Sequence, residues 1–273
     1  EQVTAGGEKH LLLASASNDC RIGIWELLDG ETVGWQTFLA DPEHKRLISV
    51  AVHGQFVTAV NTEGMVFVWM VAARNTPQLS HKFATTFTRF GLVDYSADGQ
   101  FIAIGNRSDP VQRYHIHTGQ LQQAWEVDMP TLATLAMSGD GRLVAVGGKN
   151  GQIGLWCVGE NGSVEQVGER FVGMSTAAVD RLAFSRDGKK LASTHNVGDQ
   201  TVRLWAVDSQ IGLQLRHTLV GHTHIAWSVV FGVSMGRGLQ VVTGGSDQTV
   251  RVWDAGTGQS LYTLHGPPRA LSE

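Results

Sequence analysis

The sequence contains few cysteines, few prolines and few charged residues. Its 273 residues include two cysteines, Cys20 and Cys157, which cannot form a disulfide framework or a four-thiolate metal site. Only six prolines accompany 33 glycines, so the high glycine content does not indicate a collagen-like or low-complexity chain. Hydrophobic residues make up 42% of the sequence, which is enough to bury a substantial core and excludes disorder of the whole chain.

The sequence also lacks an excess of positive charge and any long hydrophobic run. Its 21 basic and 25 acidic residues give a net charge of −4, so we expect no general affinity for nucleic acid. No stretch of about 18 consecutive apolar residues is present, and no N-terminal segment resembles a signal peptide. We therefore expect no membrane partner and a cytoplasmic location. The first residue is Glu1 rather than methionine, so we also expect the chain to be part of a longer protein.

Six segments of the sequence repeat one pattern. Each contains an apolar stretch, a turn and a second apolar stretch that ends in an aromatic residue. These aromatic residues lie 42 to 49 residues apart and are Trp25, Trp69, Tyr114, Trp156, Trp205 and Trp253. Regular recurrence at this spacing predicts a repeat architecture that covers almost the whole chain.

Within each repeat the pattern favours short β-strands. Apolar residues alternate with a period of two, and no segment sustains the stripe of an amphipathic helix. Asp-Gly pairs tolerate the positive φ that tight hairpins need, and they occur at Asp98-Gly99, Asp140-Gly141 and Asp187-Gly188. The repeat therefore holds four strands, which cannot bury both of their faces alone. We expect an all-β fold, a β-propeller of radially arranged, four-stranded antiparallel blades.

The sixth repeat resembles the WD-repeat family most fully. It contains Gly221-His222 ahead of its first strand, and residues 246–254 read SDQTVRVWD. In that family a His, a Ser or Thr, an Asp and a Trp form a hydrogen-bonded tetrad within the blade, so that each buried polar group has a partner. The resemblance implies that the tetrad here consists of His222, Thr243, Asp247 and Trp253.

The other repeats match this signature less completely. In the first repeat the His-bearing loop would precede Glu1. In the fifth repeat the serine is displaced by a two-residue insertion, and no histidine lies near residue 172. The matching residues are Ser15, Asp19 and Trp25 in the first repeat and Ser193, Asp199 and Trp205 in the fifth.

The repeats assign residues 1–273 to a single WD-repeat propeller domain. Six repeats are visible, and a seven-bladed ring with one blade missing is the alternative. The expected blades are approximately residues 1–40, 41–85, 86–127, 128–171, 172–219 and 220–264, followed by a tail at 265–273.

No pattern of residues indicates catalysis, metal binding or cofactor binding. His222 and His224, like His115 and His117, would share one face of a strand, but neither pair has a third ligand placed beside it by a motif. No serine lies in a Gly-x-Ser-x-Gly motif, and residues 147–151 lack the Gly-Lys-Ser/Thr of a phosphate-binding loop. We therefore expect no catalytic residue, no metal and no cofactor.

Trp227 is the strongest candidate for an interaction residue, because exposed tryptophans beside charged residues are typical of interface hot spots. The resemblance places Ile225 and Trp227 at the start of the innermost strand of the sixth blade, facing the upper mouth of the ring. The alternative for Trp227 is packing against the neighbouring blade. The resemblance places further residues at the corresponding mouth positions, namely Arg89, Asp180, Arg107, Lys149, Asn18 and Ser246.

The resemblance implies a non-catalytic platform that binds a protein or peptide across this top face. By analogy, the chain would be the sensor or scaffold region of a larger signalling protein, with covalently linked effector domains outside this segment. The alternative is a propeller enzyme, a hydrolase or lyase with a polar site in its channel. The innermost strands read mainly apolar or small, as in Leu182-Ala183-Phe184, which favours the platform.

Overall fold

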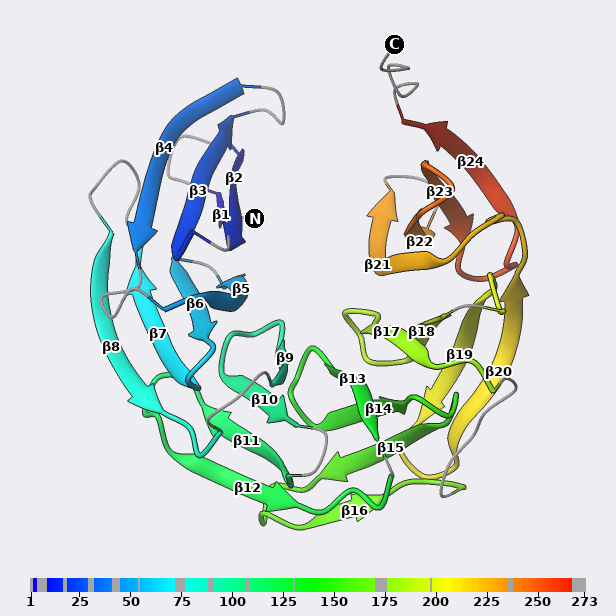
Figure 1. Ribbon diagram of the computed structural model, residues 1–273, viewed down its shortest axis with the longest axis horizontal. Coiled ribbons are helices and arrows are strands. Elements are labelled where there is room, and N and C mark those ends of the chain that lie inside the picture. The colour runs from blue at the N-terminus through cyan, green and yellow to red at the C-terminus, as the bar shows by residue number, and fades with distance from the viewer. Residues whose placement is uncertain are drawn as a thin grey trace. The chain divides into compact units, whose positions relative to one another are not determined.

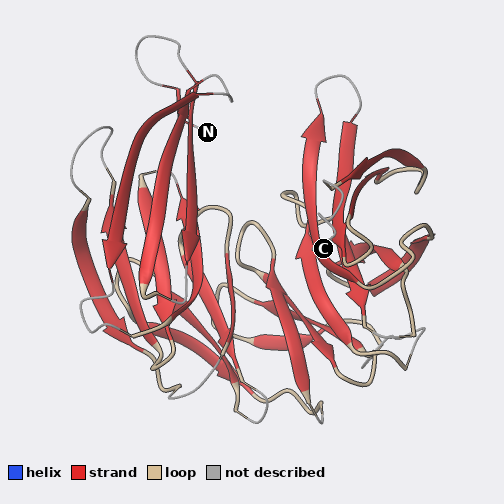
Figure 2. Cartoon of the chain, turned by 45° about the horizontal axis from the view of Figure 1, so that its top comes forward, coloured by secondary structure: helices blue, strands red, loops and turns tan. Residues whose placement is uncertain are grey.

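The computed structural model describes the chain as short β-strands. The described residues are 2–3, 9–16, 19–28, 32–40, 45–53, 55–71, 77–87, 91–106, 109–129, 131–169, 176–196, 198–234 and 238–266. Every regular element among them is a strand (Figure 2). The strands form six four-stranded sheets, in each of which neighbouring strands follow one another along the chain (Figure 1).

The chain divides into two compact units, and the first unit comprises residues 1–106 and 111–124. It contains three sheets. The first is β1 (Gln2–Val3), β2 (Lys9–Ala16), β3 (Arg21–Leu28) and β4 (Thr32–Ala40). The second is β5 (Leu47–His53), β6 (Phe56–Asn61), β7 (Met65–Met70) and β8 (Gln78–Ala84). The third is β9 (Leu92–Tyr95), β10 (Phe101–Gly105), β11 (Val111–His115) and β12 (Leu121–Trp125).

The second unit comprises residues 107–110 and 125–273, and it contains the other three sheets. The fourth sheet is β13 (Leu132–Met137), β14 (Leu143–Gly148), β15 (Ile153–Val158) and β16 (Val164–Gln166). The fifth is β17 (Val179–Phe184), β18 (Lys190–His195), β19 (Val202–Asp208) and β20 (Gly212–Leu219). The sixth is β21 (Ala226–Ser234), β22 (Gly238–Gly245), β23 (Thr249–Asp254) and β24 (Ser260–His265).

The four-strand repeat predicted from the sequence is confirmed in all six sheets. Each sheet falls within one of the expected blade ranges, except that β24 ends one residue beyond it, at His265. Most of the expected tail lies outside the described residues. The assignment of the six repeats to one domain stays a prediction.

The three Asp-Gly turns have the same geometry. In each turn the glycine has a positive φ, 71° at Gly99, 70° at Gly141 and 68° at Gly188, which a residue with a side chain adopts only under strain. A buried serine two residues before the aspartate donates its hydroxyl proton to that carboxylate, at 2.6 Å in every case. The three serine–aspartate pairs are Ser96–Asp98, Ser138–Asp140 and Ser185–Asp187.

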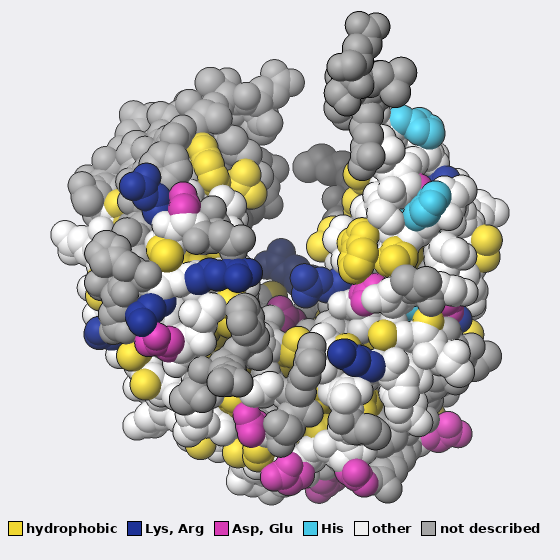
Figure 3. Space-filling view, viewed as in Figure 1, with side chains coloured by type: hydrophobic (Ala, Val, Ile, Leu, Met, Phe, Trp, Pro, Cys, Tyr) yellow, Lys and Arg dark blue, Asp and Glu magenta, His cyan; other side chains and the backbone are white. Residues whose placement is uncertain are grey.

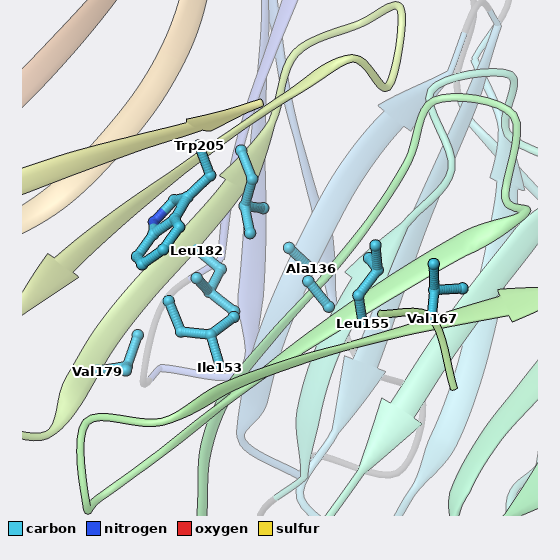
Figure 4. Close-up of a cluster of buried hydrophobic side chains, with 9 residues drawn as sticks. Ala136, Ile153, Leu155, Val167, Val179, Leu182 and Trp205 are labelled. Atoms are coloured by element: carbon cyan, nitrogen blue, oxygen red, sulfur yellow. The ribbon is translucent and has the colours of Figure 1, made fainter. Parts of the chain in front are cut away.

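The hydrophobic core lies between successive sheets of each unit. In the second unit, Trp205 of the fifth sheet belongs to one buried cluster with Ile153 and Leu155 of the fourth, and Figure 4 shows this cluster. Trp253 of the sixth sheet packs in the same way with Leu204 of the fifth. The first unit follows the same rule, because Trp69 packs on the first sheet and Tyr114 on the second. The aromatic-bearing face of a sheet thus covers the opposite face of the sheet before it.

Candidate functional site

The residues of the expected tetrad in the sixth sheet lie within hydrogen-bonding distance of one another. The indole Nε1–H of Trp253 donates to Thr243 Oγ1 at 3.0 Å, and this hydroxyl lies 2.8 Å from His222 Nε2. His222 Nδ1 lies 2.9 Å from Asp247 Oδ2. Since the threonine proton is left to donate to Nε2, the histidine proton sits on Nδ1 and is donated to the carboxylate.

Asp247 is ionised at the buried end of this chain of hydrogen bonds. Its side chain is 4% exposed and that of His222 is 1% exposed. Burial favours the protonated acid, but hydrogen bonds from Thr249, His222 and the backbone of Thr223 outweigh it and hold the pKa of Asp247 well below its usual range. The tetrad therefore joins the loop before β21 to the turn between β22 and β23.

The fifth sheet builds a comparable network from different residues. Trp205 Nε1 donates to Ser193 Oγ at 3.0 Å, and this hydroxyl lies 3.1 Å from His195 Nε2. Ser193 pairs with Arg203 across β18 and β19, just as Thr243 pairs with Arg251 across β22 and β23. The expected displacement of Ser193 is therefore wrong, because the two-residue insertion falls in the loop after β18.

His195 was not identified from the sequence, although a signal for it exists. It lies two residues after Ser193 on one strand, so both side chains point to the same face of the sheet. Burial, reinforced by the nearby Arg203 guanidinium, lowers the pKa of His195 to about 4. Asp199 takes Arg203 as its partner instead of a histidine, at 2.6 Å between Oδ2 and Nη2, and both side chains are almost fully buried.

The expected tetrad residues of the first sheet have a different environment. Ser15 and Asp19 are exposed and Trp25 is half-buried, whereas Thr243 and Trp253 are buried. Asp19 Oδ1 accepts the backbone N–H of Arg21 at 3.1 Å. Burial of the tetrad positions therefore differs between the first sheet and the sixth.

A β-bulge near the start of the first strand is common to four sheets. In the second, fourth, fifth and sixth sheets one residue of this strand has no partner in the ladder, so it is the extra residue of a bulge. These residues are Ile48, Ala133, Asp180 and Trp227. Bulges re-aim a side chain relative to the strand, and nothing in the period-two pattern marks them in the sequence.

A repeated backbone hydrogen bond closes each bulge from the side of the loop. The carbonyl two residues before the bulged residue accepts the N–H of the residue that directly follows the second strand. The four bonds are Thr62 N–H to Arg46 O, Lys149 to Thr131, Asn196 to Ala178 and Ser246 to Ile225, with lengths from 2.8 to 3.1 Å. The bulged residues are therefore held by backbone on both sides.

In the second unit we call this end of the sheets the bulge end, and define it by Lys149, Asp180, Trp227 and Ser246. The strands β13, β17 and β21 lie next to one another, so the bulges of neighbouring sheets are neighbours too. Trp227 is 51% exposed, and Figure 3 shows hydrophobic side chains gathered at the surface over β21. Lys149 and Ser246 are also exposed. Exposure of Trp227 disagrees with the alternative that it packs against the neighbouring sheet.

Asp180 differs from the other bulged residues because it carries a charge in a half-buried position. Burial raises the pKa of this carboxyl group, although a hydrogen bond from Asn196 and the positive charge of Arg181 oppose the shift. Asn196 Nδ2 donates to Asp180 Oδ1 at 3.0 Å, while Oδ2 is buried with no hydrogen-bond partner among the described residues. Asn196, at the fifth-sheet position that corresponds to Lys149 and Ser246, was missed from the sequence because the insertion hides the alignment.

The structure brings together only part of the expected interaction surface. Ile225 is half-buried and fixed by its backbone bond to Ser246. Three further residues expected at this surface lie outside the described residues, and their placement stays a prediction: Arg89, Arg107 and Asn18.

Within the described part of the chain, no group of three or more His, Cys, Asp or Glu side chains is arranged to hold a metal ion. The rings of His115 and His117 have centroids 6.0 Å apart, and His81 lies 6.4 Å from His117. Cys20 and Cys157 are half-buried. None of the described residues forms a helix with the length and hydrophobicity that a membrane crossing needs.

Two segments, residues 168–206 and 213–254, match the family described as "WD domain, G-beta repeat". In these two segments the chain carries WD repeats. A curated relative, "WD repeat-containing protein 26 homolog" of Arabidopsis thaliana, is 33% identical over 81 residues, which cover 30% of this chain and 13% of that protein. For the first four curated relatives, the matched part of this WD-repeat chain spans between 13% and 33% of the relative's length.

Solved structures resemble the WD-repeat chain over most of its length. A chain in "Crystal structure of the Chaetomium thermophilum Sqt1 bound to the N-terminus of the ribosomal protein L10" matches with a TM-score of 0.72 and 21% identity, covering 93% of this chain and 72% of that one. A chain in "Crystal Structure of Mitotic Checkpoint Complex" matches with a TM-score of 0.68 and 18% identity, covering 89% and 71%. This likeness confirms the β-propeller fold with six visible repeats.

Proposed function

We propose that the chain is a non-catalytic platform that binds a protein or peptide at the bulge end of its second unit. Trp227 is the central contact in this proposal. Trp227 contributes a large apolar surface, and Lys149, Asp180 and Ser246 contribute charged and polar groups around it. Interfaces often combine one aromatic anchor with a polar rim. Trp227 would be the anchor here, and the charged and polar residues around it would be the rim.

The observation that carries the proposal is the exposure of Trp227 on a closed bulge. The backbone N–H of Ser246 donates to the carbonyl of Ile225 at 2.9 Å, two residues before the indole. On the other side Ser228 resumes the ladder opposite Gly244. An aromatic side chain held on a fixed backbone loses little conformational entropy on binding, which increases the affinity it can provide.

The two solved structures support this class of function. In one, Sqt1 is bound to the N-terminus of the ribosomal protein L10, and the other is the structure of the mitotic checkpoint complex. Chains with a fold like that of this protein therefore occur in assemblies with other proteins, as the proposed platform would.

The test uses peptides selected for binding to the whole chain from a random display library. The dissociation constant of each selected peptide is then measured by fluorescence anisotropy for the wild type and for Trp227→Ala. Because truncation of a hot-spot aromatic costs about 2 kcal/mol or more, we expect binding to weaken by about 30-fold.

Ile211→Ala is the matched control, because Ile211 is also a large exposed apolar residue of the second unit but lies away from the bulge end, in the turn between β19 and β20. It should leave every dissociation constant unchanged. Equal binding by Trp227→Ala and the wild type, with an unaltered β-sheet circular dichroism spectrum, would remove Trp227 from the site.

We further propose that the chain works in the cytoplasm as the sensor or scaffold region of a larger signalling protein, with effector domains elsewhere in its polypeptide and no nucleic-acid or membrane partner. The net charge of −4 supports the absence of nucleic acid from this list. A fluorescent fusion of the full-length protein tests its location. A propeller enzyme has less support, because Asp180 and Arg181 are the only ionisable side chains on the described first strands of the second unit.

A further inference from the structure

The residue that directly follows each bulge resumes the pairing of the first strand with the second. In three of the four sheets with a bulge this residue carries a hydroxyl group, and it is Ser49, Thr134 or Ser228. In the fifth sheet it is Arg181, which pairs with Thr194 of β18. The other three sheets show that a bulge of this kind needs no cation at the position, so the fold does not account for the arginine.

The register of the fifth sheet places Arg181 on the face that packs against the sixth sheet. Residues paired across a ladder share a face, so Arg181 lies on the same face as Thr194 and as Val202, the partner of Thr194 on β19. Val202 belongs to the buried cluster that also contains Ala226, the residue before Trp227. Since β17 and β21 lie next to each other, Arg181 is on the side of the fifth sheet that adjoins the strand carrying Trp227.

The guanidinium of Arg181 is available to a ligand. Arg181 is exposed, and among the described residues no carboxylate forms an ion pair with it. Arg203 of the same sheet is almost fully buried and is held by Asp199. Asp180 precedes Arg181 in the strand, but its Oδ1 accepts a hydrogen bond from Asn196 and its Oδ2 is buried. The N–H donors of Arg181 therefore have no described carboxylate to bind.

The exposed charge beside Trp227 is positive. Lys149 is exposed as well, and it too forms no ion pair within the described part of the chain. Asp180 is the one carboxyl group among the residues that define the bulge end, and it is half-buried. A partner that approaches Trp227 thus meets two exposed cations, whereas the nearby carboxyl group is engaged within its own sheet. Charge complementarity favours a partner that brings negative charge.

We propose that the peptide bound at the bulge end is acidic, and that one of its carboxylates pairs with Arg181 while an apolar side chain of the same peptide covers Trp227. This inference rests on the proposed function and names the class of its partner. A guanidinium and a carboxylate match in geometry and form two parallel hydrogen bonds. The carboxylate belongs either to an aspartate or glutamate side chain or to the C-terminus of the partner, and both present the same group to Arg181.

The test uses peptides that are selected for binding to the whole chain and that lose affinity for Trp227→Ala. Each is synthesised as selected, with Asp and Glu replaced by Asn and Gln, and with an amidated C-terminus. Dissociation constants are measured by fluorescence anisotropy for the wild type and for Arg181→Ser. Serine occupies this position in the second and sixth sheets, so the variant should keep the β-sheet circular dichroism spectrum of the wild type.

We expect Arg181→Ser to weaken the binding of the unaltered peptides by about tenfold, because a hydrogen-bonded charge pair is lost. One of the two altered forms of each peptide should bind the wild type about equally weakly, and Arg181→Ser should then weaken it no further. If this form is the one with Asn and Gln, the carboxylate is a side chain; if it is the amidated form, the carboxylate is the C-terminus.

Lys189→Ser is the matched control, because Lys189 is an exposed cation of the same sheet in the Asp-Gly turn, at the opposite end of β17 from the bulge. It should leave every dissociation constant unchanged. Peptides that bind Arg181→Ser as tightly as the wild type, or that Lys189→Ser weakens as much, overturn this inference and leave the platform in place. Peptides that all bind Trp227→Ala as tightly as the wild type overturn the platform and the inference with it, as does a selection that yields no binding peptide.

Discussion

The hydroxyl that accepts the tryptophan N–H is contacted by a histidine, and this histidine comes from a different part of the chain in the fifth and sixth sheets. In the sixth sheet the histidine that meets the hydroxyl of Thr243 comes from the loop before β21, whereas in the fifth sheet it is His195 of β18 itself. In both sheets the hydroxyl accepts the indole N–H and meets a histidine Nε2. The chemistry of the hydrogen bonds is kept, but in the fifth sheet it no longer ties a loop to the sheet.

The Thr243 hydroxyl lies at the centre of the tetrad, and we expect its loss to destabilise the protein more than the loss of any other group of the tetrad. Thr243→Val keeps the shape of the side chain but leaves the Trp253 N–H and a nitrogen of His222 buried without a partner. We expect the free energy of unfolding to fall by about 1–3 kcal/mol, measured by urea denaturation. The control is Thr218→Val, since Thr218 is exposed on β20. Equal effects of the two substitutions would contradict a stabilising role for the Thr243 hydroxyl.

His195 should make the stability of the protein depend on pH. Its pKa is lowered from 6.5 to about 4, chiefly by burial, so between these pH values the unfolded chain binds a proton that the folded chain does not. The contribution of neutral His195 to the free energy of unfolding is therefore complete above pH 6.5. It is lost as the pH falls toward 4, by an amount on the order of 3 kcal/mol. His195→Gln should flatten this part of the curve, measured by urea denaturation at pH 7 and pH 4.5. Parallel curves for the two proteins would count against this assignment.

At the scale of the element, the sequence predicted hairpins better than strand starts. Asp98-Gly99 and its two counterparts were recognisable because tight turns require a positive φ, and the structure has it at each glycine. The bulges at Asp180 and Trp227 were not recognisable, because one extra residue in a strand changes neither composition nor turn chemistry. Ser193 was misplaced for the related reason that an insertion in a loop and one in a strand look alike in sequence.

Gly188 provides a test of the turn geometry alone. Its φ is 68°, and a Cβ there would meet one neighbouring atom, Ser138 Cβ, at an ordinary 3.5 Å. Gly188→Ala should therefore lower the free energy of unfolding by about 1–2 kcal/mol through backbone strain rather than through collision. Gly232→Ala is the control, because a Cβ there meets nothing within 4 Å and the φ is not positive. The melting temperatures of the two variants are compared by thermal denaturation. Equal melting temperatures would argue against backbone strain at position 188.

For the whole molecule, the sequence predicted the repeat number, the strand count of each repeat and the propeller fold. Six aromatic residues at regular spacing carried that prediction, because each lies in the third strand of its own sheet. Which residue a bulge would expose was not predictable, since Trp227 has no mark in the sequence that separates it from its neighbours in the strand. The partner was not predictable either. The residues that recur from repeat to repeat are those that form the sheets, whereas the residues at the surface differ between repeats.

The bulges also have an evolutionary consequence. A bulged residue stands outside the ladder, so replacing it does not shift the register of the strand. The four equivalent positions here hold an isoleucine, an alanine, an aspartate and a tryptophan, which shows how widely their chemistry varies on one backbone. A repeat protein built in this way can acquire a new binding specificity by point mutation at a few sites while its fold is conserved.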